Sequence, residues 1–375
     1  MKKIGISKTI IALSLYIAMM LFQTQYMGLG TKVGALTVGI TLVCMLFETH
    51  RLNRGNTVPR SLLWFFIYSI IITLVFCIVN PAFPPNFVRY LVVVTFFLLI
   101  SPLSISEKEF VYLKMVLWIS MTIYAVFIIR ACQNNPYRVY HGDIELFGTS
   151  LDPNYVGLPI VAASLILIGD LLNSRKFILI KGGCLAILLL SVIYTASRGT
   201  TLSLLVGIFI IFYGYMRNKG LSFGKIMTVL FAIIVVVFLI RYVFANFFDA
   251  IDRMTNTENG GYDNGRFELW KISIYKWMDN PLFGWGLGAG TKFIGRPSHN
   301  TYVQLLLDTG IVGFTLFVTF LVQMARKAFH QSYLLGAVVI ALFVQITFLN
   351  ALDNRCVWGI LTIVTILPPI NKRPV

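Results

Sequence analysis

Acidic residues and cysteines are both scarce in this 375-residue chain, which has 15 Asp and Glu against 31 Lys and Arg, and five cysteines. The cysteines are scattered, without a CxxC pair or a Cys/His pair at metal-site spacing, which argues against a disulfide framework and against zinc. All charged residues make up 12% of the chain, while 57% is hydrophobic and the mean hydropathy is +0.80. This composition excludes a soluble surface, so lipid must be the solvent for most of the chain.

The net charge of +16 would suggest a nucleic-acid partner in a soluble protein. Here the cations cluster in short segments between apolar runs, as the signals that orient membrane helices do. We therefore expect no nucleic-acid binding. The opening Met1-Lys2-Lys3 and the apolar run after it resemble a signal peptide, but no small-residue cleavage site follows, so we interpret the run as a retained first span.

Twelve apolar stretches have about the length needed to cross a bilayer, roughly 17 to 25 residues. We expect an all-α, polytopic membrane protein with about 12 transmembrane helices and an external loop domain that contains an amphipathic helix. Residues 1–246 would hold helices one to nine with a short external loop at about 132–153, residues 247–301 the large external loop, and residues 302–375 the last three helices and a cytoplasmic C-terminus. The predicted spans are 4–22, 28–47, 62–79, 86–101, 109–131, 154–172, 177–196, 199–216, 224–246, 302–325, 332–349 and 355–369.

The distribution of Lys and Arg predicts the orientation of these spans. With the N-terminus in the cytoplasm, 18 of the 31 cations fall in short cytoplasmic loops, so both termini are expected there. Of the 13 external cations nine are arginine, against seven of the 18 inside. Guanidinium binds phosphate through a planar fork, so this set favours a phosphate-bearing ligand, although an external arginine can also extend to lipid headgroups. The external arginines are Arg89, Arg130, Arg138, Arg198, Arg241, Arg253, Arg266, Arg296 and Arg355.

The larger external segment contains a pattern typical of a helix at residues 264–279. Phe267, Trp270, Ile274 and Trp277 recur near helical spacing, with charged residues between them, and an Asp-Asn-Pro turn follows. This predicts an amphipathic helix that lies on the membrane surface with its tryptophans at the interface.

The glycine-rich segment 284–290 superficially resembles a nucleotide-binding loop. No strand is predicted before it and no Gly-Lys-Ser/Thr follows, and the expected orientation places it where nucleotides are scarce. We therefore expect these glycines to let the backbone approach a helix or a ligand closely.

His299 is the principal candidate for a general base. The segment 296–302 leads directly into an apolar helix that Ser298 or Asn300 can cap, which places His299 beside a helix N-terminus that favours anions. Of four histidines, His299 and His141 fall on the external side, and the ordinary histidine pKa of about 6.5 suits proton transfer. The alternative is a hydrogen-bonded interfacial histidine without chemistry.

Arg198 lies in the very short external turn between two apolar spans, where a charge is costly unless it meets an anion. Its alternative is a structural pairing with Asp152, Asp308 or a helix C-terminus. Asp152 and Pro153 are typical of the N-cap and first position of a helix, and capping alone explains them. A direct ligand role for Asp152 or Asn154 is the second possibility.

Several short motifs occur together in an order that resembles a known family. They are Ser197-Arg198-Gly199, Gly265-Arg266-Phe267, Gly284-x-Gly286-x-Gly288, Ser298-His299-Asn300-Thr301-Tyr302 and Asp308-Thr309-Gly310-Ile311-Val312-Gly313. On twelve predicted spans, this set resembles the bacterial O-antigen polymerase and ligase superfamily, the Wzy and WaaL kinds of protein. The motif-bearing part covers roughly residues 190–325.

The resemblance implies a metal-independent, inverting glycosyl transfer at the outer face of the bacterial cytoplasmic (inner) membrane, without a cofactor. The donor would be an oligosaccharide linked to undecaprenyl diphosphate. By position, His299 matches the family histidine that activates the acceptor hydroxyl, and Arg198 and Arg266 match arginines that engage the diphosphate. Further residues expected to bind substrate are Arg89, Asp152, Asn154, Arg296, Asn300 and Tyr302.

Three functions remain open within these expectations. A polymerase would pass the chain to the next undecaprenyl-diphosphate-linked repeat unit, with a chain-length regulator as a further partner. A ligase would pass it to lipid A core. The modest external segment and the Asp-Pro-Asn motif favour the polymerase. A lipid-linked oligosaccharide flippase or transporter is the rival of another class, but internal repeats are not evident and the candidate residues gather at one face instead of the midplane.

Overall fold

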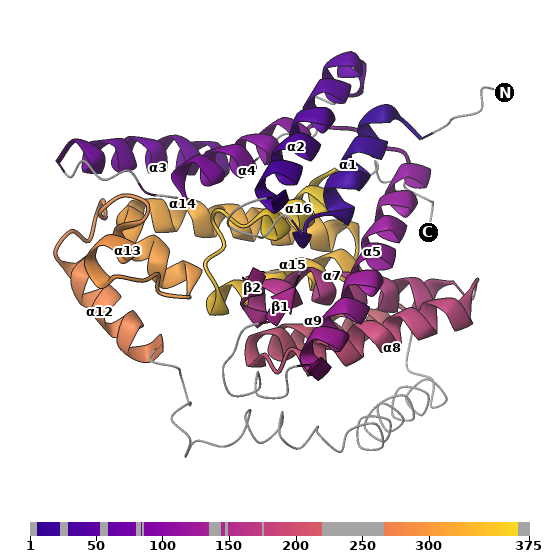
Figure 1. Ribbon diagram of the computed structural model, residues 1–375. Coiled ribbons are helices and arrows are strands. Elements are labelled where there is room, and N and C mark those ends of the chain that lie inside the picture. Colours follow the sequence, from indigo (N-terminus) through magenta and orange to yellow (C-terminus); the bar gives the residue numbers. More distant parts are fainter. Residues whose placement is uncertain are drawn as a thin grey trace.

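Helices form most of the chain that the computed structural model describes, which comprises residues 6–22, 29–52, 59–79, 84, 86–134, 144–146, 149–174, 176–219 and 266–366 (Figure 1). An apolar segment in lipid must satisfy its own backbone polar groups, and an α-helix does so within one segment. The α-helices are α1 (Lys8–Ala18), α2 (Leu29–Phe47), α3 (Arg60–Val79), α4 (Phe87–Ile100), α5 (Glu107–Asn134), α7 (Pro153–Asn173), α8 (Ile178–Tyr194), α9 (Arg198–Lys219), α12 (Arg266–Met278), α13 (Ala289–Ile294), α14 (Thr301–Gln331), α15 (Tyr333–Gln345) and α16 (Arg355–Thr365). Single 3-10 turns, η2 (Thr49–Arg51) and η3 (Ile346–Phe348), follow α2 and α15, and strands β1 (Ile144–Leu146) and β2 (Thr149–Leu151) pair antiparallel before α7.

Five of the described helices are long and apolar enough to span a membrane, namely α3, α5, α7, α9 and α14, and shorter apolar helices accompany them. The expected all-α, multi-pass membrane protein is confirmed in this form. The predicted span 224–246 and residues 247–265 of the predicted external loop lie outside the described residues, so the number of twelve spans stays a prediction. The external candidates Arg138, His141, Arg241 and Arg253 also lie outside them.

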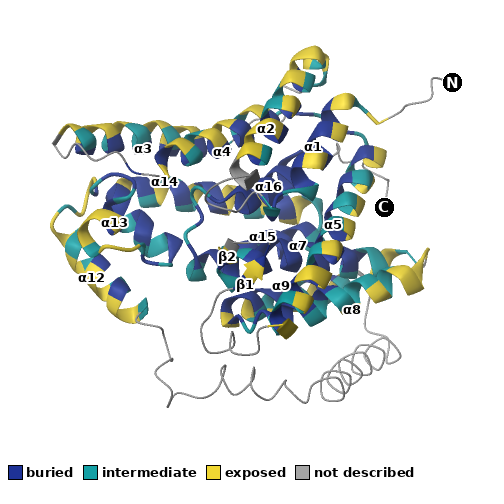
Figure 2. Cartoon of the chain, viewed as in Figure 1, coloured by how far each residue is buried: buried dark blue, intermediate teal, exposed yellow. Residues whose placement is uncertain are grey.

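Helices α7, α14, α15 and α16 form much of the interior of the bundle (Figures 1 and 2). Of the most apolar 18-residue stretch of α7, 72% is buried inside the protein. The corresponding share for α3, which packs on α14 at one side, is 28%. Large apolar side chains such as Ile78, Leu179 and Phe209 are exposed on the outer helices. Such apolar outer faces fit contact with lipid, because a soluble protein of this kind would cover them.

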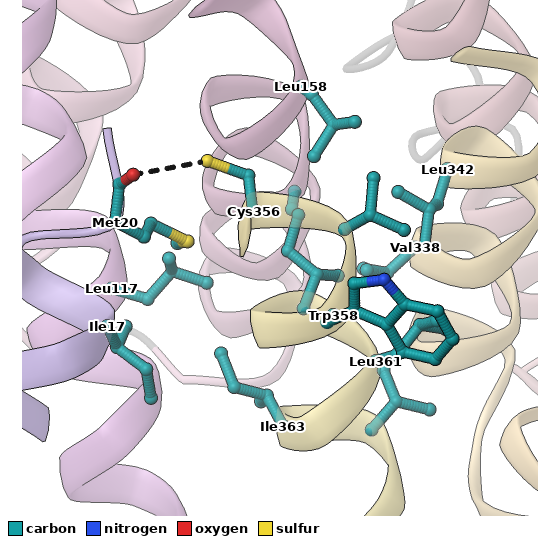
Figure 3. Packing of buried hydrophobic residues seen from close by; sticks show 14 of the residues in the cluster. Ile17, Met20, Leu117, Leu158, Val338, Leu342, Cys356, Trp358, Leu361 and Ile363 are labelled. Atoms are coloured by element: carbon teal, nitrogen blue, oxygen red, sulfur yellow. Dashed lines mark hydrogen bonds between the residues drawn. The ribbon is translucent and has the colours of Figure 1, made fainter. Parts of the chain in front are cut away.

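Helix α16 is anchored on all sides, since every residue from Arg355 to Thr365 is buried. The Trp358 ring stacks on Phe320 with centroids 6.1 Å apart. The Cys356 thiol donates to the backbone oxygen of Met20, as Figure 3 shows. Asn354 caps the helix by accepting from the backbone N–H groups of Cys356 and Val357 at 2.8 and 3.2 Å. This anchoring fixes the segment 350–354 that precedes α16.

The helix predicted at residues 264–279 is present as α12, from Arg266 to Met278. It packs against α14 and buries Leu269 and Ser273. The Trp277 indole donates to the Pro281 carbonyl at 3.0 Å, which holds the turn that leads into the glycine-rich segment.

Candidate active site

Helix α14 is broken at Gly310, whose backbone has φ 60° and ψ −169°. The break frees backbone groups on either side, and the preceding segment 281–286 satisfies them. The N–H groups of Trp285 and Gly286 donate to the carbonyls of Leu307 and Asp308 at 3.0 and 2.7 Å. On the other side, the N–H groups of residues 311 and 312 donate to the carbonyls of 281 and 282. Irregular backbone at membrane depth is tolerated where protein satisfies it in this way.

Glycine is required where this segment crosses the broken helix. Gly284 and Gly310 both have positive φ, and a Cβ added to Gly284 would overlap the backbone of Asp308, Thr309 and Gly310. A Cβ on Gly310 would likewise overlap the carbonyl of Leu282. The prediction that the glycines allow close backbone approach to a helix is confirmed.

The same crossing holds the carboxylate of Asp308 inside the protein, with 3% of the residue exposed. Its Oδ1 accepts from Gln304 Nε2 at 2.8 Å, and its Oδ2 accepts from the backbone N–H of Gly288 at 3.3 Å. The carboxylate is therefore joined to both the helix and the glycine-rich segment.

His299 has a left-handed backbone conformation, with φ 52°. This is uncommon for a residue other than glycine and costs about 1–3 kcal/mol, so the surroundings must impose it. On one side, Asn300 caps α14 by accepting from the N–H groups of Tyr302 and Val303 at 3.0 and 3.2 Å. On the other side, Ser298 is fully buried, its N–H donates to Gln304 Oε1 at 3.1 Å, and its carbonyl accepts from the Trp270 indole.

A cavity of about 330 Å³ lies beside His299. Its walls come from the start of α4, the residues before α7, the glycine-rich segment, the start of α14 and the segment between α15 and α16. We name it the aspartate pocket, because Asp152, Asp308 and Asp353 all line it together with His299. Three separate parts of the chain thus bring their carboxyl groups to one cavity.

The turn that carries Arg198 is hydrogen-bonded to the wall of this pocket. Asn154 accepts from the Ser197 hydroxyl through Oδ1 at 2.7 Å, and donates through Nδ2 to Asp152 Oδ1 at 3.0 Å. Gln345 of α15 donates from Nε2 to the Asn154 carbonyl and to Thr200 Oγ1 at 3.1 and 3.0 Å. Because a buried polar network of this kind is costly to leave unsatisfied, it fixes the turn relative to α7.

Asp353 and Arg89 form an ion pair at the edge of the pocket, with Arg89 Nη1 3.4 Å from Asp353 Oδ2. Burial raises the pKa of Asp353, and the positive charge of Arg89 opposes this rise. Arg355, two residues further along the chain, is 5% exposed. A charged side chain buried to this degree in an apolar bundle marks a candidate functional region.

The predicted site residues divide into two groups. His299 and Asp152 line the pocket, Asn154 and Asn300 are bonded beside it, and Arg89 reaches it through Asp353. The other candidates do not line the pocket. Arg198 and Arg296 are exposed, and Arg266 is partly exposed. The Tyr302 hydroxyl donates to the Phe343 carbonyl. No ion pair joins Arg198 to Asp152 or Asp308, all three of which lie in the described residues.

Sequence reasoning gave no site role to Asp353, Asn350 or Asp308. Asp353 and Asn350 lie in the short polar segment between the apolar helices α15 and α16. The acidic Asp353 between two apolar helices was the signal that could have identified this segment. Asp308 was considered as an ion-pair partner alone. Across the described ranges, no group of three or more His, Cys, Asp or Glu side chains is placed to hold a metal ion.

The break in α14 and the part of the pocket wall formed by residues 287–308 lie within a segment that matches a known family. Residues 183–318 match the family model Wzy_C, described as O-antigen ligase. No curated protein matches the chain. The match extends from α8 into α14 and includes Arg198, Arg266 and His299. Over residues 183–318 the chain is thus similar to the O-antigen polymerase and ligase superfamily, which this match supports.

Proposed function

We propose that the protein is a glycosyltransferase that joins undecaprenyl-diphosphate-linked oligosaccharide repeat units into O-antigen or a related surface polysaccharide. The observation that carries this proposal is His299, held in a left-handed conformation on the wall of the aspartate pocket. Strained residues other than glycine concentrate at active sites, where the strain fixes a reacting group. The family match over residues 183–318 supports the same class of reaction.

His299 acts as the general base in this proposal. A sugar hydroxyl is a poor nucleophile, so the imidazole takes its proton as the oxygen attacks the anomeric carbon of the donor. The new glycosidic C–O bond forms as the bond between that carbon and the diphosphate oxygen breaks. The electron pair leaves with the diphosphate, and direct displacement inverts the anomeric configuration.

Arg198 and Arg266 bind the departing diphosphate in this proposal, without a metal ion. Both residues are connected to the pocket by short hydrogen-bonded links. Arg198 follows Ser197, which is bonded to Asn154, and Arg266 lies one helical turn before Trp270, which is bonded to Ser298. Fixed guanidinium groups stabilise the charge that develops on the leaving oxygen. Substrate contacts of Arg89, Arg296, Asn300 and Tyr302 belong to the same proposal.

The proposed reaction takes place at the outer face of the bacterial cytoplasmic membrane. The expected twelve spans, cytoplasmic termini and external loop at 247–301 fit this location, because this topology would put His299 and both arginines on the side where the lipid-linked saccharide is used. A chain-length regulator is a further expected partner in the membrane.

The alternative is an O-antigen ligase, which would transfer the chain to lipid A core. The matching family is described as O-antigen ligase, which supports keeping this alternative. Polymerase and ligase share the donor and the proposed roles of His299, Arg198 and Arg266, and they differ in the acceptor alone.

Reconstitution of the purified protein with labelled undecaprenyl-diphosphate-linked repeat units tests the proposal. In the absence of lipid A core, a ladder of products is expected for the polymerase. Transfer only when lipid A core is added would establish the ligase instead. Movement of intact lipid-linked saccharide across the bilayer, with no new glycosidic bond, would overturn both and support a flippase.

A further inference from the structure

The lining of the aspartate pocket is rich in hydrogen-bond acceptors. Asp152, Asp308 and Asp353 line it, whereas neither lysine nor arginine is found among its lining residues in the described chain. Arg89 pairs with Asp353 from the edge of the pocket and compensates one of the three charges. The cavity is therefore unsuited to a diphosphate, because carboxylates repel an anion at close range.

Among the described residues, two acceptor atoms in this lining receive no hydrogen bond. Asp152 Oδ1 accepts both the N–H and the Nδ2 hydrogen of Asn154, at 2.7 and 3.0 Å, whereas Asp152 Oδ2 receives no hydrogen bond. Asn350 Oδ1 is buried and has no hydrogen-bond partner. A buried acceptor without a donor costs about 1–3 kcal/mol, so a ligand that supplies hydroxyl groups would satisfy it.

The size of the pocket also defines its ligand. A volume of about 330 Å³ lies at the lower end of the range of about 300–1,000 Å³ typical of small-molecule pockets. It suits a small saccharide and is far too small for a polyprenyl chain. Phe87 and Tyr90 contribute apolar atoms to its lining, as is usual for small-molecule pockets.

We propose that the aspartate pocket is the acceptor subsite and binds an uncharged sugar residue. This inference rests on the proposed glycosyl transfer. The acceptor is assigned here because its hydroxyl must reach the base, and His299 lines this pocket, whereas Arg198 and Arg266 lie outside it. The donor diphosphate and the acceptor sugar therefore occupy zones of opposite charge, with His299 at the acceptor zone.

The charge of the pocket determines the specificity. A sugar whose exposed primary alcohol is replaced by a carboxylate brings a negative charge toward Asp152. Like charges at close range repel each other, so a uronic acid at this position is rejected.

Binding measurements on the full-length protein in detergent test the inference without requiring turnover. The probe is the repeat-unit oligosaccharide released by mild hydrolysis from the polysaccharide of the same cells. Its matched analogue carries carboxylates made by selective oxidation of the primary hydroxyls. Wild-type protein is expected to bind the unoxidised oligosaccharide at least about tenfold more tightly than the oxidised one, as measured by saturation-transfer NMR titration.

The variant Asp152→Asn removes one charge from the pocket and keeps the fold, because asparagine caps a helix as well as aspartate does. The preference for the unoxidised oligosaccharide is expected to fall several-fold in this variant. The control Asp279→Asn makes the same change in an exposed residue outside the pocket, paired with Lys276, and is expected to keep the wild-type preference.

The outcomes separate the subsite from the reaction. Polymer formation together with equal binding of both oligosaccharides, or with a preference that Asp152→Asn leaves unchanged, would overturn the subsite and leave the reaction standing. A preference that depends on Asp152, without any transfer product, would keep the sugar-binding pocket and overturn the proposed function. Tighter binding of an amino-sugar oligosaccharide than of its N-acetylated form would overturn the assignment to an uncharged sugar.

Discussion

The indole of Trp270 donates to the backbone carbonyl of Ser298 at 2.9 Å, and Ser298 immediately precedes the strained His299. Removing this bond with Trp270→Phe should free the backbone beside His299. A hydrogen bond contributes about 0.5–1.5 kcal/mol, so transfer is expected to fall by up to about tenfold. The variant Trp277→Phe, which loses a bond to Pro281 instead, should keep most activity in the same turnover assay. Equal losses in both variants would argue against a specific role for the Ser298 contact.

His299→Asn should abolish transfer while the protein stays folded. Asparagine tolerates the left-handed conformation better than most residues, so the backbone is preserved while the base is lost. His330→Asn, at the exposed end of α14, is the control and should retain wild-type turnover. Near-normal product from His299→Asn, with an unchanged gel-filtration profile for both variants, would disprove the base assignment.

Arg198→Lys should lose most transfer activity although the charge is kept. One ammonium group cannot reproduce the planar fork with which guanidinium binds two phosphate oxygens. Arg217→Lys changes the same residue type near the other end of α9, where Arg217 Nη1 is bonded to the Tyr333 hydroxyl at 2.9 Å. That control should stay active, and wild-type turnover by Arg198→Lys would indicate a structural arginine.

Gly310→Ala should lower the thermal stability of the protein. Alanine at a positive φ is strained by about 1–3 kcal/mol, and its Cβ would in addition overlap the Leu282 carbonyl. In Gly182→Ala the new Cβ has no atom within 4 Å, so this helical site should be neutral or slightly stabilised. Melting curves of the two variants in the same detergent provide the comparison, and matching curves would contradict the requirement for glycine at the helix break.

Glu109→Gln should be strongly destabilising. The Glu109 carboxylate accepts from both terminal nitrogens of Arg51, at 2.9 and 2.6 Å, and the residue is 3% exposed. Losing this carboxylate leaves the Arg51 guanidinium with Glu48 alone, at 3.6 Å, and costs about 2 kcal/mol. Asp279→Asn removes the exposed pair with Lys276 and should change stability by less than about 1 kcal/mol. Chemical denaturation of both variants and of the wild type measures the free energy of unfolding. An equal loss in the two variants would show that the Arg51–Glu109 pair is as solvated as the surface pair.

Local features of the sequence predicted the helices and their ends well. Hydropathy identifies apolar helices because a segment in lipid must satisfy its own backbone. The caps at Asp152 and Asn300 follow from side chains that accept from the next turn, and both are confirmed. The break at Gly310 was not predicted, since the segment around it is apolar and its backbone partners come from residues 281–286.

The candidate site was predictable where its residues are close in sequence to a recognisable signal. His299 and Asp152 were both identified and both line the pocket. Asp353 and Asn350 come from the segment between α15 and α16, about fifty residues beyond His299. A single sequence carries no direct signal for this long-range contact, because it arises from the packing of α16 against the rest of the bundle.

The broken helix α14 has a consequence for the order of biosynthesis. Residues 281–286 precede α14 in the chain, so the peptide groups that satisfy the break leave the ribosome before the helix that needs them. The nascent glycine segment can therefore enter the bilayer region with α14 as one paired unit. A circular permutation that moved residues 281–286 behind α14 would keep every contact of the folded protein and remove this order of insertion.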